Sequence, residues 1–301
     1  MLRKPSWLKA PLSGGAEYRA LAQHIRSQDL HTVCEEAHCP NKGECWSRGV
    51  ATLMILGDTC TRACAFCNVK TGRPTVTDRE EPQRIAITVA KMGLKYITLT
   101  SVDRDDLDDQ GAEIWSETIR RIHAQAPALR IEALIPDFQG NLTLLDLVLD
   151  AGPDILNHNL ETVPRLQKEI RKFANWEHSL RVLDHAKSRG FTTKSGIMVG
   201  LGETREEVFE FLAVAAAHQI DIVTIGQYLQ PTMRNIDVQR YVEPNEFRDY
   251  AELALSLNIP HCSSGPLVRS SWHAEDVAMA LSSVRPGYER NETGILHPKD
   301  V

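Results

Sequence analysis

The chain has 301 residues and an ordinary globular composition, with 42% hydrophobic and 25% charged residues. One α/β barrel can absorb about 250 residues as a single domain, so this length does not require two domains. The formal net charge of −6 disfavours nucleic acid or an anionic membrane as the main partner. No stretch approaches about 20 consecutive apolar residues, and the first residues, MLRKPSWLKAPL, lack the apolar core of a signal peptide. We therefore expect a cytoplasmic protein with no membrane and no nucleic-acid partner.

A first group of cysteines follows a short helical run at 16–28. The sequence HTVCEEAHCPNKGECW places Cys34, Cys39 and Cys45 in a C-x4-C-x5-C frame. Proline, asparagine and glycine within it indicate a compact loop that can wrap around a metal centre. Because a reducing cytoplasm disfavours structural disulfides, metal binding is the better interpretation of these thiols.

A second group follows at once, in the sequence CTRACAFC at 60–67. It places Cys60, Cys64 and Cys67 in a C-x3-C-x2-C frame directly after a predicted buried strand. Thiolate sulfur is a preferred ligand of iron–sulfur clusters and zinc. Three cysteines leave one iron of a cubane 4Fe–4S cluster open to a small molecule. The alternative is a zinc knuckle shared by both groups, although neither has the paired C-x2-C spacing typical of structural zinc.

Strands and helices then alternate along the chain, which is typical of a parallel α/β fold. Short runs rich in Ile, Val, Leu and Thr predict strands at 51–57, 96–102, 131–137, 155–161, 193–200 and 222–229. Helical periodicity predicts helices at 82–93, 112–125, 176–190, 205–219 and 243–259. The cysteine loop stands where a Rossmann sheet would have its glycine-rich turn. We therefore predict a partial (β/α)6 TIM-type barrel at 51–260, an N-terminal cysteine-rich extension at 1–50 and a short C-terminal extension at 261–301.

Polar side chains gather where the predicted strands end. In a parallel barrel these ends share one face, and that face carries the chemistry. Any single one can instead be a helix N-cap, as for Asp137, Thr143 or Thr204. Near the C-terminus, HCSSGPLVRSSWHAED predicts by local rules a short strand, a turn and a helix start, with Ser270 or Ser271 as an N-cap.

Taken together, these segments resemble the lipoyl synthases, a family of radical S-adenosylmethionine (SAM) enzymes. The C-x3-C-x2-C frame with Phe66 before its third cysteine is the radical SAM signature. The resemblance extends from KPSWLK at 4–9 to RSSWHA at 269–274 and includes TSVDRDDL at 100–107, LNHNLETVPRL at 156–166 and GIMVGLGET at 196–204. The double cysteine group and the RSS sequence together separate this family from other radical SAM enzymes.

The resemblance implies two 4Fe–4S clusters and SAM as cofactors. It assigns Cys60, Cys64 and Cys67 to the SAM-binding cluster. It assigns Cys34, Cys39, Cys45 and the oxygen of Ser271 to an auxiliary cluster. The implied reaction is radical insertion of sulfur at C6 and C8 of a protein-bound N6-octanoyl-lysine, with the auxiliary cluster as the sulfur source. An oxygen ligand suits this role because it matches iron–sulfur poorly and can leave.

The remaining site residues and the partners are expectations of the same kind. By their position in the predicted strands, we expect SAM contacts from Thr100, Asn159, Glu161, Lys194, Met198 and Val199. Glu161 can instead pair with Arg165 at i+4, and Met198 can be a core residue. The family implies three kinds of partner: an octanoylated lipoyl carrier domain (a 2-oxoacid dehydrogenase E2 subunit or a glycine cleavage H protein), a reductant such as ferredoxin or flavodoxin, and a cluster-rebuilding carrier. The alternatives are another dual-cluster radical SAM sulfur-transfer enzyme and a non-catalytic zinc or iron–sulfur binding module.

Overall fold

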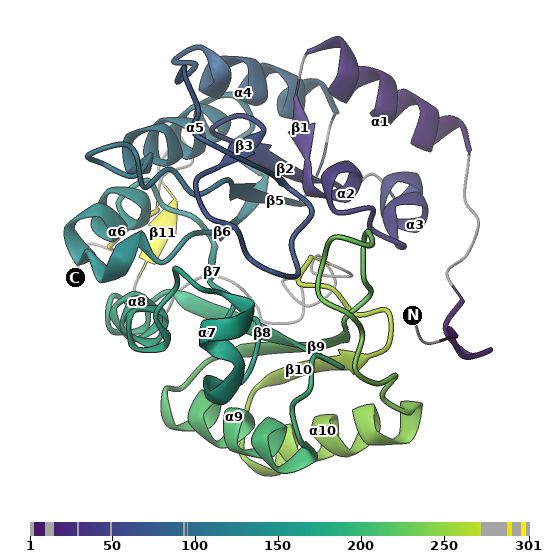
Figure 1. Ribbon diagram of the computed structural model, residues 1–301. Helices are drawn as coiled ribbons and strands as arrows, with labels where there is room; N and C mark the ends of the chain where they lie inside the picture. The colour runs from purple at the N-terminus through teal and green to yellow at the C-terminus, as the bar shows by residue number, and fades with distance from the viewer. Residues whose placement is uncertain are drawn as a thin grey trace.

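The fold is built on one curved, mostly parallel sheet with helices on its outer side (Figure 1). The computed structural model describes residues 3–9, 15–28, 30–48, 50–92, 94, 96–271, 288–290 and 296–298. The strand order is β1-β2-β5-β6-β7-β8-β9-β10, and only β1 is antiparallel to its neighbour. The strands of this sheet are β1 (His31–Thr32), β2 (Thr52–Ile55), β5 (Tyr96–Ser101), β6 (Arg130–Leu134), β7 (Ile155–Asn157), β8 (Thr192–Val199), β9 (Ile222–Gln227) and β10 (His261–Gly265).

The predicted α/β fold class, a partial barrel, is confirmed. All six predicted strands are present, and β10 adds a seventh parallel strand by pairing with β9. The sheet runs from β1 at one edge to β10 at the other, so within the described residues it curves without closing. The helices that link and cover its strands are α4 (Glu81–Met92), α5 (Ala112–Gln125), α6 (Leu142–Leu149), α7 (Gln167–Ile170), α8 (Trp176–Ser188), α9 (Arg205–Ala217) and α10 (Pro244–Ser256).

The hydrophobic core lies between the sheet and these helices. Alternate residues of the central strands, such as Ile97 and Leu99, are fully buried, which explains why short apolar runs became strands. The helices bury one face each, as Trp115 of α5 and Phe211 of α9 show. One part of the core lies under β2, β5 and β6, and another under β8 and β9. The inner side of the sheet is thereby left for polar groups.

The N-terminal segment packs as small helices beside the β2 edge of the sheet (Figure 1). The ring centroids of Tyr18 and Trp46 are 5.2 Å apart, and Arg26 forms an ion pair of 2.9 Å with Glu35. The helices of this segment are α1 (Ala16–Ser27), α2 (Val33–Glu36) and α3 (Lys42–Ser47).

Two separate pairs of short strands and two 3-10 turns complete the described structure. The parallel pair is β3 (Thr59–Cys60) with β4 (Lys70–Thr71), and the antiparallel pair is β11 (Tyr288–Arg290) with β12 (Leu296–Pro298). The 3-10 turns are η1 (Phe138–Gly140) and η2 (Pro164–Leu166).

The predicted division at residues 50 and 260 stays a prediction. The sheet itself continues past 260, because β10 lies in register with β9. The helix start predicted after the RSS sequence falls at 272–287, which lies outside the described residues.

Candidate active site

A cavity of about 520 Å³ lies at the carboxyl ends of the parallel strands. Residues that follow β2, β5, β6, β7 and β9, and residues in the second half of β8, contribute to its lining, as expected for the functional face of a parallel barrel. Ten of the predicted site residues line it: Cys34, Cys39, Cys60, Cys64, Cys67, Thr100, Asn159, Glu161, Met198 and Ser271. The structure therefore brings both cysteine groups and the RSS sequence to one cavity.

The loop at 60–67 is fixed from three sides by backbone hydrogen bonds. The N–H of Thr61 donates to the carbonyl of Asp103 (3.0 Å), and the N–H of Ala65 donates to Ile170 (2.9 Å). The carbonyl of Ala65 in turn accepts from Ile236 (3.0 Å). The loop is therefore a rigid platform between the β5, β7 and β9 ends, and its cysteines keep a defined spacing.

The three thiols of this loop face one another and a polar surrounding. The Sγ of Cys60 accepts hydrogen bonds from the N–H groups of Arg62 (3.4 Å) and Asp103 (3.3 Å), which favours a thiolate at that atom. Burial is nevertheless the main influence: it raises the pKa of Cys60 and of Cys64 to about 12, and the pKa of Cys67 to about 11. Without a metal these thiols stay protonated, so cluster binding must release protons here.

Arg62 is a charged residue of this loop that the sequence reasoning missed. It is buried, and its guanidinium contacts Asp105 (2.7 Å), Asp137 (2.9 Å) and Asp103 (3.4 Å). Asp103 also lies 3.5 Å from the Sγ of Cys60. The run of charges after β5 is therefore not a solvated surface. It is the counter-charge of an arginine that holds the cysteine loop in place.

The group of Cys34, Cys39 and Cys45 belongs to the N-terminal segment, and two of its cysteines line the cavity. Cys34 is buried in α2, Cys39 follows in a turn whose N–H donates to the Cys34 carbonyl (3.2 Å), and Cys45 lies in α3. Burial, and next the nearby Cys39, raise the pKa of Cys34, and the neighbouring Thr52 acts in the opposite direction. Cys45 packs against the core and is absent from the cavity lining.

Ser271 lies beside the group of Cys34, Cys39 and Cys45. Its Oγ accepts a hydrogen bond from the hydroxyl of Thr52 (2.8 Å), and Thr52 is also one of the groups that influence the pKa of the Cys34 thiol. Ser270 points elsewhere, toward Asn157 and Asn159 at the end of β7. Of the two serines, Ser271 is therefore the one that is linked through Thr52 to the surroundings of Cys34. None of the described cysteines is in a disulfide.

Glu161 has unusual backbone geometry at the cavity wall. Its φ of 65° is in the left-handed region, and such strain persists where the surrounding structure imposes it, often at functional sites. Burial raises the pKa of its carboxyl, and the nearby Arg171 acts in the opposite direction. The alternative pair with Arg165 is not formed, because Arg165 binds Glu207 at 2.7 Å. Glu161 thus lines the cavity with its carboxyl near Asn159 and Arg171.

Two predicted SAM contacts do not reach the cavity. Lys194 is buried near the start of β8, where its Nζ lies 2.8 Å from Glu132. Val199 is fully buried and packs in the core under β8 and β9. Lys194 lies at the end of its strand that is remote from the carboxyl ends, and Val199 points to the opposite face from Met198 because strand side chains alternate. The geometry supports no ligand contact for either residue.

His158 and Arg171 are further cavity residues that the sequence reasoning missed. The ring of His158 is buried, with Nδ1 2.8 Å from the carbonyl of Ile135 and Nε2 2.9 Å from the hydroxyl of Ser179. Burial lowers the pKa of His158 to about 4, so the ring is neutral at pH 7. Arg171 donates to the carbonyls of Asn159 (3.1 Å) and Leu160 (3.2 Å).

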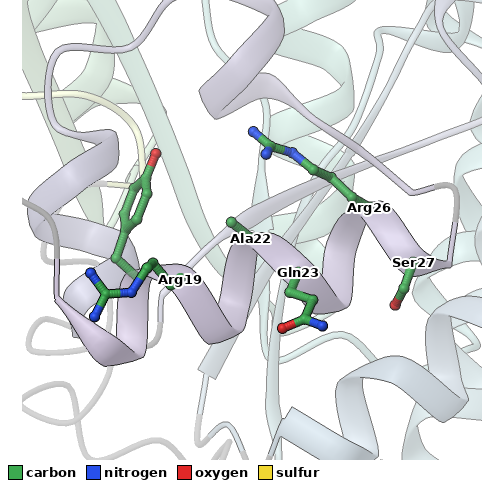
Figure 2. A pocket seen from close by; sticks show the side chains of 6 residues that line it. Arg19, Ala22, Gln23, Arg26 and Ser27 are labelled. Atoms are coloured by element: carbon green, nitrogen blue, oxygen red, sulfur yellow. The ribbon is translucent and has the colours of Figure 1, made fainter.

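Two further searches bear on the nature of the site. Among the described residues, no three His, Cys, Asp or Glu side chains are gathered as a single metal ion would need, and this holds for each cysteine group as it does for a shared zinc knuckle. A second hollow, of about 590 Å³, lies on α1 and is lined by Tyr18, Arg19, Ala22, Gln23, Arg26 and Ser27 (Figure 2). It contains no thiol and comes from one helix, so the inner cavity is the better candidate.

Comparison with solved structures shows the fold. The chain is similar to the hydrogenase maturase HydG (TM-score 0.56, 14% identity, 70% of this chain and 50% of that chain). It is also similar to methylornithine synthase (TM-score 0.51, 15% identity, 71% of each chain). The sequence profile of the Radical SAM superfamily matches residues 54–215, and the profile of the N-terminal domain of lipoyl synthase matches residues 1–39.

Curated relatives decide the family. The lipoyl synthase of Laribacter hongkongensis is 52% identical over 92% of this chain and 89% of its own length. That of Oceanobacillus iheyensis is 50% identical over 98% of this chain and 96% of its own length. The chain belongs to the lipoyl synthase family. This membership confirms the predicted enzyme class, a radical SAM sulfurtransferase, and its cofactors, SAM and two 4Fe–4S clusters. No helix in the described part of the chain has both the length and the apolar character that crossing a membrane requires.

Proposed function

We propose that this chain inserts sulfur at C6 and C8 of an octanoyl group that is amide-linked to a lysine of a lipoyl carrier domain. One observation carries the proposal: cysteines from both groups, five of the six, and Ser271 line a single cavity at the carboxyl ends of the parallel strands. A reaction that combines two clusters on one substrate needs such a shared space. A binding module would not need it.

The donor sets fit two clusters of different character. Cys60, Cys64 and Cys67 offer three thiols, and among the described residues that line the cavity no further cysteine belongs to their loop, so one iron is left for the amino and carboxylate groups of SAM. For Cys34, Cys39 and Cys45 we propose Ser271 as a fourth, oxygen donor, because Thr52 links it to the surroundings of Cys34. When bound, the two clusters and SAM supply a radical that removes hydrogen from an unactivated carbon and the sulfur that replaces it.

The protein's own contribution is to bind, orient and exclude water. No side chain can deprotonate an alkane, so no general base is assigned. Apolar residues of the cavity wall, such as Val102, Leu134 and Ile135, suit an octanoyl chain and keep the site dry. For SAM we propose Thr100, Asn159, Glu161 and Met198, which all line the cavity. The Glu161 carboxylate suits the ribose hydroxyl groups.

The partners follow from the same proposal. The carrier domain is a 2-oxoacid dehydrogenase E2 subunit or a glycine cleavage H protein, and a ferredoxin or flavodoxin delivers the electron. Because the auxiliary cluster is the sulfur source, a cluster-rebuilding carrier must renew it between turnovers. The place of action is the cytoplasm, where such reductants keep thiols reduced.

The activity is tested with full-length protein carrying both clusters, under anaerobic reducing conditions. With SAM and an octanoyl-lysyl peptide, it should give 5′-deoxyadenosine, methionine and lipoyl peptide. Release of methionine with no change in the peptide would contradict the proposed substrate.

The role of Ser271 is tested by Ser271→Ala. SAM cleavage should persist, because the Cys60–Cys67 group is untouched, while the yield of lipoyl peptide falls at least tenfold. The matched control is Ser256→Ala at the exposed end of α10, which should keep both activities. Full product yield from the Ser271 variant would refute this assignment.

A further inference from the structure

The segment that follows β10, residues 265–271, crosses the inner side of the sheet and contacts several of its strands. At β9 it lies so close that a Cβ on Gly226 would be 2.1 Å from the carbonyl oxygen of Val268. Between Cys39 and Cys45, the side chain of Asn41 donates to the carbonyl of Leu267 (2.6 Å). A glycine is therefore required at position 226 for this segment to seat.

Ser270 makes the contacts that fix the end of this segment. Its hydroxyl accepts a hydrogen bond from the Nδ2 of Asn157 (3.3 Å) and donates one to the Oδ1 of Asn159 (2.9 Å). Both asparagines belong to the end of β7, on the far side of the cavity from Cys34. The single donor of the Ser270 hydroxyl and one of its two acceptor positions are thus used by the asparagines at the end of β7.

A buried ion pair stands behind Asn157. The same Nδ2 also donates to Glu132 (2.7 Å), whose carboxylate contacts the Nζ of Lys194 (2.8 Å) and the hydroxyl of Tyr96. Glu132 and Lys194 are almost completely buried. A buried pair of this kind is a poor source of stability, and its best-attested use is to specify one arrangement. Here it fixes the orientation of the Asn157 amide.

We propose that Ser270 is a positioning residue that anchors the tail 265–271 to β7, so that the adjacent Ser271 faces the Cys34 thiol. The anchor comprises Asn157 and Asn159, and the Glu132–Lys194 pair holds it. The two serines thus have different roles. Ser270 forms hydrogen bonds with residues at the end of β7, and Ser271, beside Thr52, is the ligand of the auxiliary cluster. This inference rests on the proposed role of Ser271 as a cluster ligand.

The test uses full-length, anaerobically reconstituted protein and the Mössbauer spectrum of its auxiliary cluster. The expected result is that Ser270→Ala gives the same altered spectrum as Ser271→Ala, since both remove the oxygen ligand. Ser270→Thr keeps the hydroxyl and should restore the wild-type spectrum. Gly226→Ala touches no hydroxyl but displaces the tail, and it should reproduce the altered spectrum.

A double-mutant cycle supplies the second readout. Ser270→Ala alone should reduce lipoyl product about tenfold, whereas in the Ser271→Ala background it should reduce it no further, because both act through one ligand. A double variant whose product yield falls by the product of the two single losses would overturn the proposal. So would a wild-type Mössbauer spectrum of the auxiliary cluster in Ser270→Ala. Loss of SAM cleavage in that variant would also overturn it, since Ser270 would then act through Asn159. A wild-type spectrum in Ser271→Ala would instead refute the proposed ligand itself.

Discussion

Arg62 is the charge on which the geometry of the cysteine loop depends. Arg62→Gln leaves Asp103, Asp105 and Asp137 without their counter-charge, and loss of one partner of a buried ion pair costs about 3–5 kcal/mol. We expect a fall of that size in the free energy of unfolding and less iron at the Cys60–Cys67 group. Denaturant unfolding and iron analysis measure both.

The matched control for this variant is Arg79→Gln. Arg79 and its partner Glu113 are exposed, with 68% and 63% of their side-chain surfaces accessible, and such pairs contribute only about 0–1 kcal/mol. Equal effects from the two arginine variants would show that the buried network does not hold the loop.

His158 gives the protein a pH dependence with a defined sign. Its pKa is about 4 in the folded chain, against about 6.5 when unfolded, because burial disfavours the charged ring. Above pH 6.5 its contribution to stability is complete. As the pH falls from 6.5 to 4, only the unfolded state takes up the proton, so about 3 kcal/mol is lost. In His158→Gln the stability of the cluster-free protein should depend less steeply on pH in this window, and an unchanged slope would contradict this explanation.

At the level of single residues, cysteine spacing predicted which residues line the cavity better than strand position did. Cysteine spacing is a local property, and five of the six thiols line the cavity as expected. Side-chain direction is not local. Met198 and Val199 are neighbours in sequence, yet only Met198 lines the cavity, because the pleat sends them to opposite faces. Arg62 was missed because its partners come from two other loops.

Among the elements, α9 shows how a strand-end polar residue can be structural. Thr204 forms a capping box with Glu207: its hydroxyl accepts from the Glu207 N–H (3.2 Å), and the Glu207 carboxylate accepts from the Thr204 N–H (2.8 Å). Thr204→Ala should lower the free energy of unfolding by about 1 kcal/mol, with unchanged iron content. Thr204→Ser keeps the cap and should be neutral. A loss of iron in the alanine variant would place Thr204 in the site instead.

Helices and strands also show which parts of the fold local sequence can predict and which parts it cannot. Central strands such as β2, β5 and β9 carry short runs rich in Ile, Leu and Thr, because parallel strands are buried on both faces, and the long helices carry a periodic apolar face. β10 has the sequence HCSSG, which shows a short strand but not its pairing with β9. That pairing is a tertiary contact, and so are the seat of the tail on Gly226 and the anchor of Ser270.

In the whole molecule, three distant segments meet at one cavity. The N-terminal helices carry Cys34 and Cys39, the loop after β2 carries the second cysteine group, and the tail after β10 carries Ser271 (Figure 1). The sequence indicated that each segment carries chemistry. Only the fold shows that the N-terminal helices and the tail after β10 reach the same cavity. The first are brought there by the pairing of β1 with β2, and the second by the contact of Ser271 with Thr52.

The most direct test is an anaerobic count of iron and zinc in three proteins: the wild type, the Cys34/Cys39/Cys45→Ala variant and the Cys60/Cys64/Cys67→Ala variant. Two separate 4Fe–4S clusters predict about eight irons per chain in the wild type, about four in each variant, and little zinc. Loss of all metal from both variants, or one zinc per wild-type chain, would contradict the account of two clusters at one cavity.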